Sequence, residues 1–87
     1  MNEIEYFKSL TGKYLSVSIN INDYQYRYNG VLLDVYDTGI LLLDRKVGKV
    51  RISTRDVSIL DIKDIEDVEL DSNYQDMLEE VENASRR

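Results

Sequence analysis

The spacing of hydrophobic residues along this 87-residue chain changes from one segment to the next, and each spacing predicts a different element. Ile4, Phe7 and Leu10 recur at the spacing of one helical face, which predicts a short helix over residues 2–10. Asn2 stands at the capping position of this helix. A helix this short depends on docking against the rest of the fold.

The hydrophobic period then becomes two, which is typical of half-buried strands. We predict five strands, over residues 13–21, 24–36, 40–43, 49–54 and 57–62. Short polar segments rich in Asp, Asn and Gly separate them and predict tight turns. Gly30 interrupts the second strand, and a glycine inside a strand marks a bulge or a sharp bend.

An acidic linker over residues 63–71 and an amphipathic helix over residues 72–84 complete the pattern. Ser72 and Gln75 stand at the spacing of a capping box, which predicts that the helix begins there. Its apolar stripe consists of Tyr74, Met77, Leu78 and Val81. We expect this stripe to pack on its own chain or within a homo-oligomer, with capture of a separate partner protein as the alternative.

The order of helix, five short strands and helix predicts a mainly β fold with a single domain. Five strands with one glycine bend suit a strongly bent antiparallel sheet that closes into a small barrel and so hides its edges. We assign residues 1–62 to this barrel with its N-terminal helix, residues 63–71 to the linker and residues 72–84 to the added helix.

Four motifs carry a resemblance to a known family. They are LTGKYLSVSI at residues 10–19, NGVLLDV at 29–35, DTGILL at 37–42 and KVRISTRDVSIL at 49–60. Together they resemble the Sm-like family, which includes Sm proteins, their archaeal and bacterial relatives and Hfq. The C-terminal domain of the ribosome maturation factor RimP is similar. The resemblance implies a five-stranded Sm-like (SH3-like) barrel whose edge strands pair between subunits, giving a homo-oligomer such as a ring.

The residues that hold RNA in the family differ in this chain. Leu41 stands where RNA-binding Sm proteins have a base-binding Asn, and Ser53-Thr54 stand where they have Arg-Gly. The Tyr-Lys-His signature of Hfq is also missing, although Asp37 is kept. Recognition of a base requires a stacking plane with donors or acceptors at its edge, and Leu41 offers neither. We therefore expect a non-enzymatic protein-interaction and assembly module without the usual base pocket.

RNA binding through other residues is the alternative function. A row of tyrosines on one strand face offers stacking planes, and a group of basic residues offers phosphate contacts. These candidates are Tyr24, Tyr26, Tyr28, Asp37, Arg45, Lys46, Lys49, Arg51 and Arg55. The competing interpretation is that the tyrosine row packs against Tyr14 or a neighbouring subunit, and that the basic residues form a solvated face that pairs with the acidic C-terminal segment.

Composition narrows the function further. The chain has no Cys and no His, so it lacks thiolate ligands, cysteine nucleophiles and the commonest general base, and we expect no enzyme activity, cofactor or metal site. The net charge of −6 sits in the C-terminal segment, since residues 1–60 carry seven acids and eight bases, and residues 61–87 carry ten acids and three bases. With no apolar run of membrane-spanning length and no signal pattern, we expect a soluble cytoplasmic protein.

Overall fold

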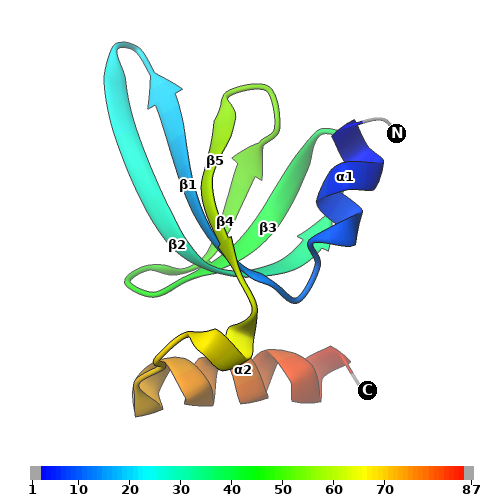
Figure 1. Cartoon of the computed structure of the whole chain (residues 1–87), viewed down its shortest axis with the longest axis vertical. Helices are drawn as coiled ribbons and strands as arrows, with labels where there is room; N and C mark the ends of the chain where they lie inside the picture. Colours follow the sequence, from blue (N-terminus) through cyan, green and yellow to red (C-terminus); the bar gives the residue numbers. More distant parts are fainter. Residues whose placement is uncertain (1–2, 86–87) are drawn as a thin grey trace.

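The computed structural model describes residues 3–85, over which five strands lie between two helices (Figure 1). The elements are α1 (Glu3–Ser9), β1 (Tyr14–Ile21), β2 (Tyr24–Val35), β3 (Gly39–Asp44), β4 (Gly48–Ser53), β5 (Val57–Lys63), the single 3₁₀ turn η1 (Ile65–Asp67) and α2 (Ser72–Ser85). The two helices and five strands predicted from the spacing are confirmed to within a residue or two at their ends. Asn2, the expected cap of the first helix, lies outside the described residues.

The five strands form one antiparallel sheet in the order β4-β3-β2-β1-β5. The sheet is strongly curved, with α1 beside one end of it and α2 beneath its curved base (Figure 1). No pairing joins β4 to β5 among the described residues, so the sheet is open and these two strands are its edges. The expectation of a closed barrel with hidden edges is therefore not met by the strand pairing.

A two-residue turn connects β1 to β2. Asn22 and Asp23 have φ angles of +49° and +70°, the left-handed backbone of the turn that matches the twist of a hairpin. Asn and Asp accept this conformation more readily than other non-glycine residues. The turn sets Ile21 opposite Tyr24, and the pairing runs without interruption to Tyr14 opposite Val31.

Gly30 lies where β2 bends against β3. A Cβ atom at this position would lie 1.7 Å from the carbonyl oxygen of Leu43, so only glycine fits. The predicted bend is therefore explained by close backbone approach. The bulge itself comes three residues later, where the β2–β3 register shifts between Leu32 and Asp34.

Apolar side chains cover both faces of the bent sheet. The concave face holds the larger core, which α1 covers with Phe7 and Leu10; its other members are Leu15, Val17, Ile19, Leu32, Ile40, Leu42 and Ile52. The convex face holds a second core of Tyr14, Val31 and Leu43, covered by Tyr74 of α2. The strict alternation expected for β1 is therefore wrong at Tyr14, which α2 buries, and at Ile21, which is 48% exposed at the tip of the hairpin.

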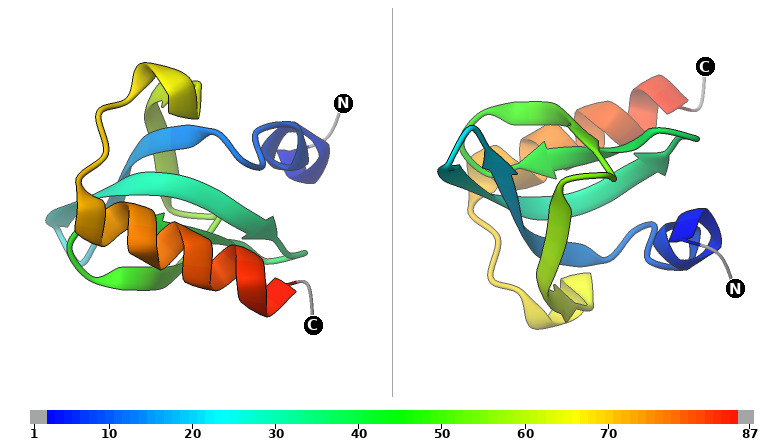
Figure 2. Two further views of the ribbon diagram at one scale, coloured as in Figure 1. Left: turned by 90° about the horizontal axis from the view of Figure 1, so that it is seen from below. Right: turned by 90° about the horizontal axis from the view of Figure 1, so that it is seen from above.

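The linker and the start of α2 are tied to the sheet. The Lys13 ammonium pairs with the Asp64 carboxylate, and apolar linker residues such as Ile65 and Val68 pack against the convex core. The cap of α2 is Asp71 rather than Ser72, because the Asp71 carboxylate accepts a 2.8 Å hydrogen bond from the Tyr74 N–H. The predicted cap was therefore wrong by one residue. Figure 2 shows α2 lying across the sheet from below.

Candidate functional site

Tyr74, the first residue of the predicted interface stripe, is buried in its own chain. Its side chain is 1% exposed, and its hydroxyl accepts a 2.8 Å hydrogen bond from the Val31 N–H. The same hydroxyl donates a 2.6 Å hydrogen bond to the carbonyl oxygen of Leu43. Burial raises the pKa of Tyr74 to about 12, because the charged phenolate would lose its hydration. Tyr74 thus holds α2 on the sheet and offers no surface to a partner.

Arg45 completes the anchorage of α2. Its guanidinium carbon lies 5.8 Å from the ring centre of Tyr14 and 6.0 Å from that of Tyr74, within the range of cation–π attraction. The two rings meet edge to face with centres 6.4 Å apart. Arg45 also donates a 2.8 Å hydrogen bond to the carbonyl oxygen of Glu69. One of the five basic candidates therefore clamps the linker to the convex core.

The remaining stripe residues are half-buried against the sheet of the same chain. Met77, Leu78 and Val81 pack on the convex core, so the helix folds back on its own chain. This is one of the two arrangements left open by the sequence. Beside the helix lies a hollow of about 460 Å³ whose lining includes Thr11, Leu33, Ile65, Leu78 and Val81. Apolar side chains of α2 and of the sheet thus remain accessible along this hollow.

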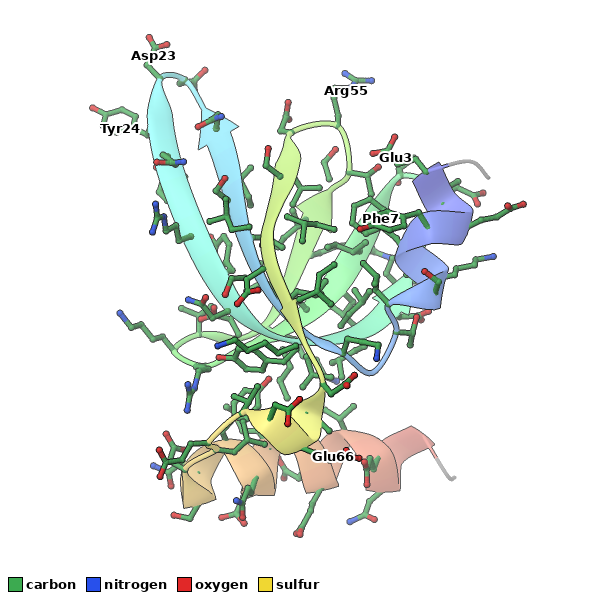
Figure 3. All side chains as sticks on the ribbon, in the orientation of Figure 1. Glu3, Phe7, Asp23, Tyr24, Arg55 and Glu66 are labelled. Atoms are coloured by element: carbon green, nitrogen blue, oxygen red, sulfur yellow. The ribbon has the colours of Figure 1, made fainter. Side chains whose placement is uncertain are left out.

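The tyrosine row of β2 lies on the concave face of the sheet, at the end away from α2. Tyr24 is 69% exposed and Tyr26 46% exposed, whereas Tyr28 packs partly against the concave core. Figure 3 shows Tyr24 next to Asp23 at the tip of the hairpin. Tyr14 belongs to the opposite face, so the interpretation that the row packs against Tyr14 is wrong.

The five basic candidates do not form one patch. Arg45 and Lys46 lie in the turn between β3 and β4. Arg55 lies in the connection between β4 and β5, at the other end of β4 (Figure 3). The guanidinium carbon of Arg51 lies 4.2 Å from the ring centre of Tyr36, which holds it against its own chain. The basic residues are therefore close in the sequence but lie at different places on the surface.

Two further positions that the resemblance aligns with the base pocket of the family, Asp37 and Leu41, lie before and within β3. Asp37 is exposed in the turn between β2 and β3, and Leu41 is half-buried in β3 opposite Arg51. Leu41 and Lys49 line a shallow hollow beside Val81 of α2. At the position of the family's base-binding Asn, this chain therefore presents an aliphatic side chain next to a helix.

Asp44 is a buried carboxylate that sequence reasoning left unassigned. It is 5% exposed and accepts hydrogen bonds from the N–H groups of Asn29, Lys46 and Val47, at 2.8, 2.9 and 3.1 Å. These bonds hold the turn between β3 and β4 and fasten it to β2. Its place directly before a turn is the signal that could have found it, since Asp favours such positions.

The edge strand β5 carries exposed apolar side chains. Leu60 is 50% exposed and Ile62 is 37% exposed, and Val57 and Ile59 are half-buried. Leu60 is the extra residue of a bulge, because the register between β1 and β5 shifts at this point. An edge strand with an apolar surface and free backbone groups is a site where another strand pairs.

Compared with protein-family models, with curated proteins and with solved structures, the chain matches none. Across residues 3–85, no group of three or more carboxylates has the arrangement of a metal site. No helix in the described part of the chain has the length and apolar character needed to cross a membrane.

Proposed function

We propose that this chain is a non-enzymatic, Sm-like protein-interaction and assembly module that forms homo-oligomers and lacks the usual base-binding pocket. The order of α1 followed by five antiparallel strands with a bend at Gly30 supports the Sm-like assignment. The sheet order also supports it, because β4 and β5 lie at opposite edges, as head-to-tail pairing of subunits requires.

The exposed edge strand β5 is the observation that carries the proposal. Its seven residues include four apolar ones, of which Leu60 and Ile62 are exposed, and β1 is its only partner strand among the described residues. Soluble proteins usually protect such an edge with charges, bulges, prolines or a covering segment. In β5 the bulge at Leu60 and the charges of Asp61 and Lys63 lie in its second half, and the first half, Val57 to Ile59, has none of them. Here the second edge, β4, offers the complementary unpaired strand on each further copy.

The altered pocket positions support assembly over RNA binding. Leu41 has neither a donor nor an acceptor for a base edge, and Arg51 lies against Tyr36. No His or Cys is available for catalysis. The surface features that remain are strand edges and apolar side chains, which suit protein contacts.

Light scattering coupled to size exclusion tests the proposal. We expect the native protein to have a mass that is a multiple of the 10.2 kDa chain. The double substitution Leu60→Lys and Ile62→Lys places charges on the β5 edge and should lower this mass. Val47→Lys is the matched control, because Val47 is 64% exposed but lies in the turn before β4. An equal effect of the control, or a native protein that stays monomeric, would refute the proposal.

A further inference from the structure

The β1–β2 hairpin extends beyond both neighbouring strands. On one side, β5 pairs with β1 only as far as Ile19; on the other, β3 begins to pair with β2 at Gly30. Residues 20–25 therefore project beyond β5 as a two-stranded ribbon, and residues 24–28 of β2 pair only with β1 (Figure 1). We call residues 20–28 the hairpin arm. Over residues 3–85, no strand lies beside the arm in the place that β3 fills from Gly30 onward, which we call the empty place.

Hydrogen bonds at Asn29 show which backbone groups face this empty place. The Asn29 N–H donates to the Asp44 carboxylate, and the Asn29 carbonyl accepts from the Arg45 N–H, so Asn29 faces away from β1. Backbone direction alternates along a strand, and the β1–β2 register is uninterrupted here. Gln25 and Arg27 therefore also turn their N–H and C=O groups away from β1, toward the empty place.

The concave face of the arm is apolar and exposed. Ile21, Tyr24 and Tyr26 are 48%, 69% and 46% exposed, and they share this face because Ile21 lies opposite Tyr24. Exposed apolar side chains gathered on a strand with one unpaired edge are typical of a surface that contacts another chain.

We propose that the arm of a second copy of this chain fills the empty place, with the two β2 strands antiparallel about a two-fold axis at Tyr26. Gln25 of each copy then lies opposite Arg27 of the other, and the two exchange backbone hydrogen bonds. Tyr26 lies opposite Tyr26 of the second copy, and Tyr24 opposite Tyr28. The same five residues thus complement themselves, as a two-fold interface requires.

Charge and backbone conformation favour this register over the two adjacent registers. Moving the axis to Arg27 sets the two Arg27 guanidinium groups directly opposite one another, which is unfavourable. Moving it to Gln25 draws the turn residue Asp23 into the ladder, although its φ angle of +70° does not fit a strand. The axis at Tyr26 pairs all five residues from Tyr24 to Tyr28 and brings no like charges together.

This contact is independent of the proposed assembly through β4 and β5. It is two-fold, whereas pairing of β4 with β5 is head to tail, and it uses no residue of either edge. Where both contacts form, the arm joins two assemblies and doubles their mass.

A single cysteine at the axis tests the arrangement. The chain has no Cys, and Tyr26→Cys would face its own copy as a non-hydrogen-bonded pair, where Cα atoms lie about 4.5 Å apart, within disulfide reach. We expect Tyr26→Cys to oxidise to a covalent dimer at micromolar concentration. Tyr24→Cys is the control, because Tyr24 is more exposed but lies opposite Tyr28 in the second copy. Equal cross-linking of both variants, or none, would overturn the proposal.

Two pairs of substitutions test the register and the backbone bonds. Gln25→Glu would create two symmetric pairs with Arg27 and should tighten the dimer by roughly 2- to 10-fold, whereas Gln25→Lys should weaken it by a similar factor. Arg27→Pro removes the N–H that faces the second copy and should abolish the Tyr26→Cys cross-link, while Arg27→Thr, which keeps this N–H, should preserve it. The reverse order in either pair would refute the register.

The β5 variants separate this contact from the edge assembly. Leu60→Lys with Ile62→Lys should leave the Tyr26→Cys cross-link unchanged, and Arg27→Pro should leave assembly through β4 and β5 unchanged. Loss of the cross-link in the β5 variant would show that the arm has no contact of its own and would overturn this inference. Loss of mass in the β5 variant with an intact cross-link supports both contacts.

Discussion

The Tyr74 hydroxyl donates a 2.6 Å hydrogen bond to the carbonyl oxygen of Leu43, across 31 residues of chain. It also accepts from the N–H of Val31, the residue that lies opposite Leu43 in the β2–β3 pairing. A side chain of α2 therefore stands where the two strands would otherwise bond directly. Through these two hydrogen bonds, Tyr74 fixes α2 to the centre of the sheet. The start of the apolar stripe of α2 is therefore not accessible to other proteins.

Tyr74→Phe should destabilise the fold strongly. The substitution leaves the Val31 N–H and the Leu43 carbonyl buried without a partner, at a cost of about 2–4 kcal/mol in the free energy of unfolding. Urea unfolding followed by circular dichroism measures this difference. Tyr6→Phe is the matched control, because Tyr6 is 43% exposed on α1. A Tyr74→Phe variant as stable as the control would contradict the bridging role.

The contribution of Tyr74 should depend on pH in the alkaline range. Burial raises its pKa from 10.0 to about 12 in the folded chain, so the unfolded chain loses this proton first as pH rises. The contribution of Tyr74 to the free energy of unfolding is therefore fully present below pH 10 and is lost as the pH rises toward about 12. The Lys13 ammonium also has a raised pKa, through its hydrogen bond to Asp64, and its contribution fades in the same direction.

Comparison of the native protein with the Tyr74→Phe variant isolates the contribution of the Tyr74 hydroxyl to stability. Both keep Lys13, so the difference between their unfolding free energies should stay constant from pH 7 to 9 and shrink above pH 10. A difference that stays constant up to pH 11.5 would contradict the assignment of the shifted group to Tyr74.

Gly30→Ala should be among the most damaging single-methyl changes in the chain. The added Cβ would lie 1.7 Å from the Leu43 carbonyl oxygen, so β2 and β3 must separate, which we expect to cost more than about 3 kcal/mol. Gly12→Ala is the control: Gly12 has a φ angle of +87° and open space around it, so its cost is backbone strain of about 1 kcal/mol. Similar melting temperatures of the two variants would argue against close approach at Gly30.

Short U-rich and A-rich RNAs should not bind. Arg45 is held by the Glu69 carbonyl and Arg51 by the Tyr36 ring, and Arg55 lies at the far end of β4. Fluorescence anisotropy of labelled RNA, titrated with the protein at low and at physiological salt, measures this binding. Binding that weakens with a salt slope of about 0.7 per contacted phosphate would instead favour the RNA alternative. In that case Lys49→Glu with Arg51→Glu should abolish it.

Local spacing predicted the elements well and their mutual contacts poorly. The turn at Asn22-Asp23 and the strand over residues 49–54 follow from local chemistry, and both are confirmed. The burial of Tyr14 under α2 could not be predicted, because spacing on β1 carries no information about Tyr74, which is 60 residues away in the chain. Pairing of the basic residues with the acidic segment was one expectation, but the hydrogen bond from Arg45 to the backbone carbonyl of Glu69 depends on the same docking and could not be specified.

The candidate surfaces show the same limit. The tyrosine row was found from alternation alone, but its empty neighbouring place follows only from the register, in which β3 begins at Gly30. The helix cap moved from Ser72 to Asp71 because either residue type suits the position, and only the backbone decides between them.

The bridge from Tyr74 also sets the order in which the chain can complete its fold. During synthesis, β2 and β3 emerge before residue 74, and until then the Val31 N–H and the Leu43 carbonyl bond to water or directly to one another. The edges of the sheet are therefore available before its centre is finished. A chain that ends before residue 74 therefore lacks the Tyr74 bridge at the centre of its sheet, and docking of α2 completes it.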